Sequence, residues 1–98
     1  MRAALKECLD CGRMDYSATF VYISPRGHAL LEDIRASDRT LVVDHLWCHA
    51  TPFIRAGVRP SSRIVFSALV GRYRRKDDTV DYCLSGVRQV RPIDIAAI

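Results

Sequence analysis

The chain has 98 residues, of which 49% are hydrophobic and 27% are charged. This length suits one domain, residues 1–98, with a core of limited size and no room for separate catalytic and regulatory domains. The composition excludes a disordered tail, and no apolar run reaches the roughly 18–20 residues that span a bilayer. The first twelve residues are charged and lack an apolar stretch of signal-peptide length, so we expect a cytoplasmic protein with no membrane partner.

The net charge of +4 is unevenly distributed along the chain. Residues 1–53 hold 6 basic and 7 acidic side chains, whereas residues 54–98 hold 9 basic and 4 acidic ones. Of the 15 basic residues, 13 are arginine, whose planar guanidinium matches phosphate groups and stacks on bases. A GC-rich genome also favours arginine, but codon usage does not explain why the positive charge gathers in the second half.

The first part of the chain predicts a short helix followed by a hairpin. Residues 3–9 place apolar side chains on one helical face, although so short a helix needs a packing partner. Residues 17–24 are rich in β-branched and aromatic side chains and predict a strand. Residues 25–27 form a turn, and residues 29–35 predict the returning strand, with a helical turn as the alternative.

The middle of the chain holds the strongest strand pattern. Residues 40–47 predict a third strand, and residues 50–62 predict a loop or a short helical connection because they contain two prolines and a glycine. Residues 63–73 are the clearest strand, with small and large apolar side chains alternating along one face.

A charged turn and a returning strand follow. Residues 74–78 form the turn, and residues 78–84 predict the strand that comes back from it. Gly86 predicts a bulge or a corner, after which residues 87–91 continue the strand until Pro92 ends it.

Five strands with a non-strand connection between the third and the fourth predict a mainly β fold. The expected architecture is a small, closed or half-closed, five-stranded Greek-key barrel, preceded by a short N-terminal helix or knuckle. Residues 44–47, 62–73 and 82–84 resemble the second half of OB-fold single-strand-binding domains, in which an I-x-F-x-A-x-V-x-x-Y run forms a long curved strand. The resemblance covers about half of the chain and implies an OB-like barrel that binds nucleic acid. It transfers no functional residue.

The basic turn is the first candidate site. Residues 72–76 lie between two strands, and Tyr82 returns nearby. Single-strand binders combine a positive groove with aromatic platforms for bases, which is the residue content of this segment. Strand alternation would put Arg72 and Arg74 on one face and Tyr73 and Arg75 on the other. The alternative is a solvated hairpin tip that keeps a β edge soluble, partly neutralised by the two aspartates that follow.

Further arginines around the connecting loop and the last strand extend this basic surface. The predicted interface comprises Arg55, Arg59, Arg63, Arg72, Tyr73, Arg74, Arg75, Lys76, Tyr82 and Arg88. We therefore expect a non-enzymatic module, monomeric or homodimeric, that binds single-stranded DNA or RNA in a salt-sensitive way. The alternative is a phage- or mobile-element-type inhibitor or adaptor, similar to anti-CRISPR proteins, that binds a larger nucleic-acid-processing complex through Trp47 and Phe53.

Four cysteines raise the possibility of one structural zinc ion. Cys8 and Cys11 form a Cys-x-x-Cys knuckle, and His45 with Cys48 supplies a later His-x-x-Cys, which together make a Cys₃His set. Cys48 with His49, or Cys83, are other ways to complete the site. His45 lies within a predicted strand, where it faces away from Cys48 unless the strand ends at Trp47. The alternative is no cofactor, with ordinary cysteines that pack as small hydrophobic residues.

No motif indicates catalysis. The sequence has no Gly-rich phosphate loop, no His-Glu-x-x-His and no recognisable nucleophile, and adjacent Cys48 and His49 are the best nucleophile pair it offers. Among the aromatic residues, we expect Phe20, Tyr22, Phe53 and Phe66 mainly in the core. We expect Trp47 to be a core or barrel-mouth anchor, with a platform for base stacking as the alternative. We expect Tyr16, Tyr73 and Tyr82 to be exposed, because they lie at strand ends near polar residues.

Overall fold

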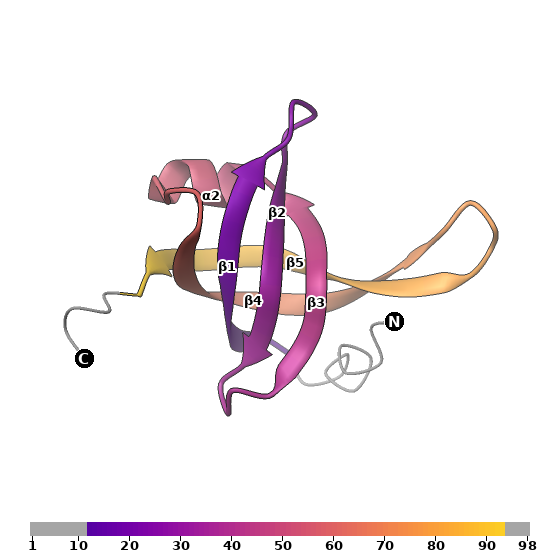
Figure 1. Cartoon of the computed structure of the whole chain (residues 1–98). Coiled ribbons are helices and arrows are strands. Elements are labelled where there is room, and N and C mark those ends of the chain that lie inside the picture. The colour runs from indigo at the N-terminus through magenta and orange to yellow at the C-terminus, as the bar shows by residue number, and fades with distance from the viewer. Residues whose placement is uncertain (1–11, 94–98) are drawn as a thin grey trace.

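A computed structural model describes residues 12–93 as one antiparallel sheet with a short helix (Figure 1). The elements are β1 (Met14–Ile23), β2 (His28–Ala36), β3 (Leu41–His49), α2 (Thr51–Ala56), β4 (Ser62–Arg74) and β5 (Val80–Pro92). The mainly β prediction is confirmed, and each predicted strand is present, with bounds shifted by a few residues. The predicted helix over residues 3–9 lies outside the described residues. No helix within residues 12–93 has the length and apolar character needed to cross a membrane.

The five strands form a single sheet in the order β3-β2-β1-β4-β5, and every neighbouring pair is antiparallel. The sheet is not closed: β3 and β5 are its two edges. The bulge predicted at Gly86 is present, where β5 residues 86–87 face a single residue of β4. A second irregularity follows at Gln89, which has a φ of 57°. Such bulges in β5 interrupt the regular row of backbone N–H and C=O groups that β3 would need for pairing with β5.

The sheet folds back on itself around an aromatic core. Figure 1 shows β4 and β5 crossing behind β1, β2 and β3 at a steep angle. The rings of Tyr16 and Phe66 lie 6.1 Å apart between these two layers. Tyr16 is only 2% exposed, so its predicted exposure is wrong: its partner strand β4 covers it.

A bulge in β1 turns two aromatic residues of the sequence to opposite faces. The register against β2 shifts between Phe20 and Tyr22, so the two side chains do not share a face as strand alternation predicts. Phe20 is buried as expected, whereas Tyr22 is 46% exposed. Trp47 is also exposed, at 43%, and its ring meets that of Tyr22 edge-on at 5.8 Å. The expected core position of Tyr22 is therefore wrong, and of the positions expected for Trp47 the core is excluded.

The helix α2 anchors the connection between β3 and β4 through one side chain. Phe53 is 1% exposed and its ring lies 5.9 Å from that of Phe20 and 6.2 Å from that of Phe66. Gly57 ends the helix in a left-handed conformation, with a φ of 66°, and donates its N–H to the carbonyl of Ile54. So short a helix depends on this packing rather than on its own hydrogen bonds.

Replacing the anchor should destabilise the whole fold. We expect Phe53→Ala to lower the free energy of unfolding by about 3–5 kcal/mol, because it empties a site between two other rings. The neighbouring Ile54 is 60% exposed, and Ile54→Ala should change stability by less than about 0.5 kcal/mol. Urea denaturation followed by circular dichroism measures both. Equal effects of the two substitutions would contradict the anchoring role of Phe53.

Candidate nucleic-acid interface

The gap between the two sheet edges forms a groove of about 830 Å³, which we call the edge groove. Its walls come from the beginning of β2, the end of β3, the helix α2 and the middle of β5. The lining residues are His28, Trp47, Cys48, His49, Thr51, Pro52, Arg55, Ala56 and residues 83–90. The groove exists because the sheet does not close, so it is a consequence of the fold rather than of one loop.

The edge groove is positively charged. Arg55 and Arg88 are both exposed and line it from α2 and from β5. His28 and His49 are direct partners on β2 and β3, with ring centroids 6.2 Å apart. Among the lining residues that fall within 12–93, none is an aspartate or a glutamate. A groove lined by charges of one sign concentrates ligands of the opposite sign, which here are anions.

Trp47, the single tryptophan of the chain, forms a ridge beside this groove. It also borders a second hollow of about 400 Å³, whose other lining residues are Ser24, Arg26 and His28. Trp47 therefore borders two hollows, and each of them has an arginine among its lining residues. An exposed indole next to arginine is a suitable platform for stacking a base.

The long β4–β5 hairpin extends beyond the body of the protein (Figure 1), and we call its residues 71–82 the arm. The strand register places Arg72 opposite Tyr82 and Arg74 opposite Val80. Since directly paired residues share a face, these four side chains form one side of the arm, the arm face. The arm face therefore contains three residues of the predicted interface, namely Arg72, Arg74 and Tyr82.

The other side of the arm pairs its charges internally. Arg75 forms a salt bridge with Asp81, and Tyr73 donates a hydrogen bond to the same carboxylate at 3.4 Å. The hydrogen bond that Arg75 donates to Asp81, together with the charge of that carboxylate, raises the pKa of Arg75 above its ordinary value. Asp77 accepts hydrogen bonds from Thr79 within the turn. The predicted interface residues of the arm are thus divided between the arm face, whose arginines are exposed, and a side whose charges are paired.

Arg63, a predicted interface residue, is engaged within the sheet. Its guanidinium donates to Ser17 Oγ at 2.9 Å, to Thr19 Oγ1 at 3.2 Å, and to the carbonyl and carboxylate of Asp33 at 2.9 and 3.0 Å. The side chain is 22% exposed. It ties β4 to β1 and β2 in the outer face of the sheet. Arg59 lies exposed in the loop after α2, and Lys76 is exposed in the arm turn.

The two residues predicted to bind zinc that the structure describes, His45 and Cys48, lie on opposite sides of β3. β3 continues to His49, so His45 is exposed on the outer face while Cys48 is buried in the core. Cys8 and Cys11 lie outside the described residues. Within residues 12–93, no group of three or more metal-ligating side chains occurs. Cys48 and His49 likewise point to opposite sides of β3, with one buried and the other exposed.

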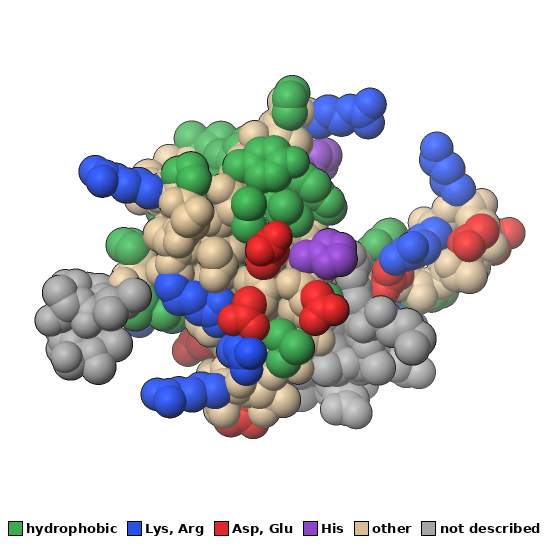
Figure 2. All heavy atoms as spheres, viewed as in Figure 1, with side chains coloured by type: hydrophobic (Ala, Val, Ile, Leu, Met, Phe, Trp, Pro, Cys, Tyr) green, Lys and Arg blue, Asp and Glu red, His purple; other side chains and the backbone are tan. Residues whose placement is uncertain are grey.

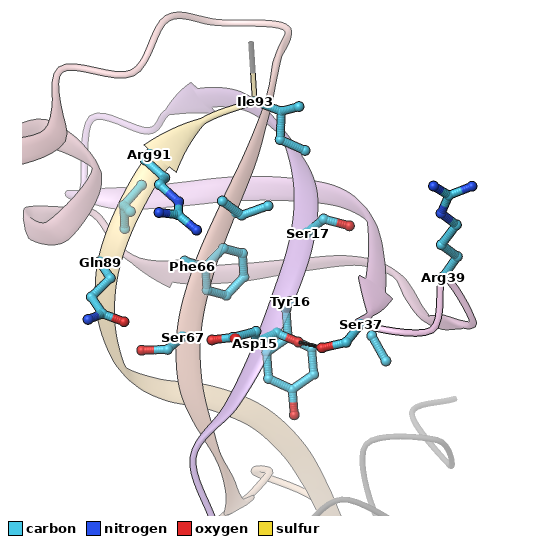
Figure 3. A pocket seen from close by; sticks show the side chains of 13 residues that line it. Asp15, Tyr16, Ser17, Ser37, Arg39, Phe66, Ser67, Gln89, Arg91 and Ile93 are labelled. Atoms are coloured by element: carbon cyan, nitrogen blue, oxygen red, sulfur yellow. Dashed lines mark hydrogen bonds between the residues drawn. The ribbon is translucent and has the colours of Figure 1, made fainter. Parts of the chain in front are cut away.

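A further hollow, of about 610 Å³, lies on the other side of the sheet edge β5 (Figure 3). Residues of β1, β4 and β5 line it, with Tyr16 and Phe66 among them. Figure 3 shows Arg91 pointing toward these rings and Arg39 pointing away from them. Asp15 is part of this lining and its carbonyl accepts a hydrogen bond from Ser37. Its mixed charge makes this hollow less suited to an anionic ligand than the edge groove.

Comparison of the chain with protein-family models, with curated proteins and with solved structures finds no match. Function must therefore be inferred from the described residues and their arrangement. Two of the predicted interface residues, Arg55 and Arg88, line the edge groove. His28 and His49 were not predicted to be neighbours, because their pairing depends on the register of β2 and β3.

The four hydrogen bonds of Arg63 should make it a structural residue. We expect Arg63→Met, which keeps the aliphatic stem, to lower the free energy of unfolding by about 1–3 kcal/mol. Arg59→Met, in the exposed loop, should change it by less than about 0.5 kcal/mol. Urea unfolding of both variants tests this difference. An Arg63→Met variant as stable as wild type would show that the hydrogen bonds of Arg63 are not needed for stability.

The interaction of Arg63 with the carboxylate of Asp33 also predicts a dependence of stability on pH. A hydrogen bond from Arg35, and the charges of Arg35 and Arg63, lower the pKa of Asp33 below its ordinary value of 3.8. Because the folded pKa is the lower one, the contribution of the carboxylate to stability is present above pH 3.8 and is lost as the pH falls through the folded value. The stability difference between wild type and Arg63→Met should therefore shrink in acid. Unfolding curves at pH values on both sides of 3.8 measure it, and a constant difference would exclude this ionic contribution.

Proposed function

We propose that this protein is a non-enzymatic module that binds single-stranded nucleic acid in the edge groove. The observation that carries the proposal is the exposed Trp47 ring, which lines the same groove as Arg55 and Arg88, with no acidic side chain among the lining residues of the described part of the chain. Single-strand binders combine these two elements: aromatic rings stack with bases of any sequence, and basic side chains contact the backbone.

The ligand path continues from the groove onto the arm. Leu84 lines the groove, and Tyr82, two residues before it, belongs to the arm face with Arg72 and Arg74. Trp47 and Tyr82 would stack with bases, and the arginines on both sides would contact phosphates. From Arg88 to Val80 the strand extends about 25 Å at roughly 3.3 Å per residue. A path of this length suits a site of about 4–8 nucleotides, at the low end of what one OB fold covers.

The arrangement of the elements supports an OB-type assignment. A three-stranded meander leads through a helix to β4, which pairs back onto β1, and β5 then pairs with β4. OB folds are partly open five-stranded Greek-key barrels that bind ligands with strands 2 and 3 and with the loops after strands 1 and 4. Here β3 supplies Trp47, while the loops after β1 and β4 supply Arg26 and Lys76.

Electrostatics sets the expected salt dependence. Four arginines on the path (Arg55, Arg72, Arg74 and Arg88) give a slope of log affinity against log salt of about −3 for a single strand. Affinity should then fall about 50-fold between 50 and 200 mM salt. Each stacked base contributes about 1–3 kcal/mol, so loss of one platform should weaken binding by about tenfold or more.

Trp47 allows a direct test, because it is the only tryptophan in the chain. Titration with unlabelled eight-nucleotide oligo-dT and oligo-U should quench its fluorescence, and anisotropy of labelled oligonucleotides should give the affinity. Trp47→Leu should weaken binding by about tenfold to a hundredfold. Arg55→Gln/Arg88→Gln and Arg72→Gln/Arg74→Gln should each reduce the salt slope by about 1.4.

The matched control is Arg39→Gln/Arg59→Gln, which removes two exposed arginines outside the path. Its affinity should stay within about threefold of wild type, apart from the general effect of net charge. Absence of binding at 50 mM salt would disprove the proposed function. Binding that is equally reduced in all three arginine pairs, with no quenching of Trp47, would disprove this site.

A further inference from the structure

The outer face of β1, β2 and β3 carries an exposed apolar row. Tyr22 on β1 pairs with Leu30 on β2, which pairs with Trp47 on β3, so the three side chains lie side by side across the sheet. Tyr22 is 46% exposed and Trp47 43%. Figure 2 shows hydrophobic side chains gathered on the upper part of this face. Exposed, adjoining aromatic residues of this kind mark interaction sites on otherwise polar surfaces.

Acidic side chains lie directly below this apolar row (Figure 2). The acidic residues of β2 and β3 are Glu32, Asp33 and Asp44. Asp33 is compensated by salt bridges to Arg35 and Arg63. Glu32 and Asp44 are exposed, and within residues 12–93 no ion pair uses either of them. We call Tyr22, Leu30, Trp47, Glu32 and Asp44 the apolar–acidic face.

The arm face has the complementary composition. Arg72 and Arg74 are exposed, and no ion pair of the described residues uses them. Val80, opposite Arg74, is 52% exposed and adds an apolar side chain to the arm face. The acidic residues of the arm lie in its turn and on its other side, where Asp81 pairs with Arg75. The arm face is thus an apolar side chain flanked by two uncompensated arginines.

We propose that the protein self-associates by docking the arm face of one copy on the apolar–acidic face of a second copy. Arg72 and Arg74 then lie against Glu32 and Asp44 of the other copy. Val80 of the first copy packs on the apolar row of the second copy, which consists of Tyr22, Leu30 and Trp47. This inference is independent of the proposed nucleic-acid function, because it rests on the charges and exposed apolar area of the two faces.

A reciprocal dimer is the favoured form of this association. One two-stranded arm offers a contact well below the roughly 800 Å² per partner of a standard interface. Two arms exchanged around a two-fold axis double the buried area, and closed two-fold dimers are the commonest assemblies. The molecule measures 44 × 33 × 19 Å, and Figure 1 shows the arm projecting from its body. A projecting arm can reach a neighbour without a change in its own fold.

Sedimentation velocity on nuclease-treated protein tests the proposal. Between about 5 and 500 µM, wild type should shift from monomer to dimer, as mass action requires. The dimer dissociation constant should increase at least tenfold between about 50 and 500 mM salt, since the contact pairs opposite charges. Monomer throughout this concentration range at low salt would overturn the proposal.

Charge reversal on each face identifies the contact. Glu32→Lys/Asp44→Lys and Arg72→Glu/Arg74→Glu should each be monomeric alone, because like charges then face each other. Mixed in equal amounts, the two variants should form a heterodimer, since both contacts of the reciprocal pair again join opposite charges. Circular dichroism verifies that each variant is folded.

The matched control, Asp15→Lys/Asp38→Lys, makes the same change in charge outside the two faces and should still dimerise. Dimers that persist in either reversal variant would overturn the proposal and place the interface elsewhere, for example along the edges of β3 and β5. Failure of the two reversal variants to associate when mixed would also overturn it. A wild type that stays monomeric without nucleic acid and still binds oligonucleotide would disprove the dimer and leave the nucleic-acid function standing.

Discussion

The pairing of β1 with β4 is the constraint on which the rest of the structure depends. Residues 14–20 run antiparallel to residues 62–68 without a break, and this ladder joins the β1–β2–β3 meander to the β4–β5 hairpin. On the inner side of the ladder, Tyr16 meets Phe66 and the core forms around them. On the outer side, Arg63 reaches across the same ladder to β1 and β2. Long-range contacts of this kind convert two separate hairpin-like units into one sheet.

This ladder also determines where the charges of the chain end up. The meander comes from the slightly acidic half of the sequence, and its outer face carries Glu32, Asp33 and Asp44. The hairpin comes from the basic half, and its arm extends away from the body of the protein (Figure 1). Because β3 and β5 do not pair with each other, the edge groove opens between the two halves, and the charged side chains that line it within residues 12–93 are cations. An uneven charge distribution in sequence thus becomes two surfaces of opposite sign.

Local patterns in the sequence were sufficient to predict the strands and the face of each arm residue. Alternation along residues 63–73 and the glycine at 86 identified β4 and the bulge in β5, because both are local features. Tyr22 was misplaced because one bulge in β1 reverses the face of every residue after it. Arg63 was counted as a surface cation because its partners, Ser17 and Asp33, are 46 and 30 residues away in sequence.

The edge groove itself had no signal in the sequence. It depends on the failure of β3 and β5 to pair, which follows from the bulges at Gly86 and Gln89 and from the curvature of the whole sheet. The pairing of His28 with His49 likewise requires the exact register of two strands that alternation alone does not fix. Arg55 and Arg88 were selected as basic residues, but only the tertiary fold brings them to one groove.

Trp47 belongs to both surfaces, and this has a thermodynamic consequence for the two proposals. One side of its ring borders the cationic groove, and the other joins Tyr22 on the apolar–acidic face. Arg72 and Arg74 are shared in the same way, since the arm face would contact either phosphates or a second copy. A nucleic-acid base stacked on Trp47 and the arm of a second copy packed over Trp47 would compete for the same atoms of the indole ring. Because linkage is reciprocal, nucleic acid then favours the monomer to the same degree that dimerisation weakens nucleic-acid binding.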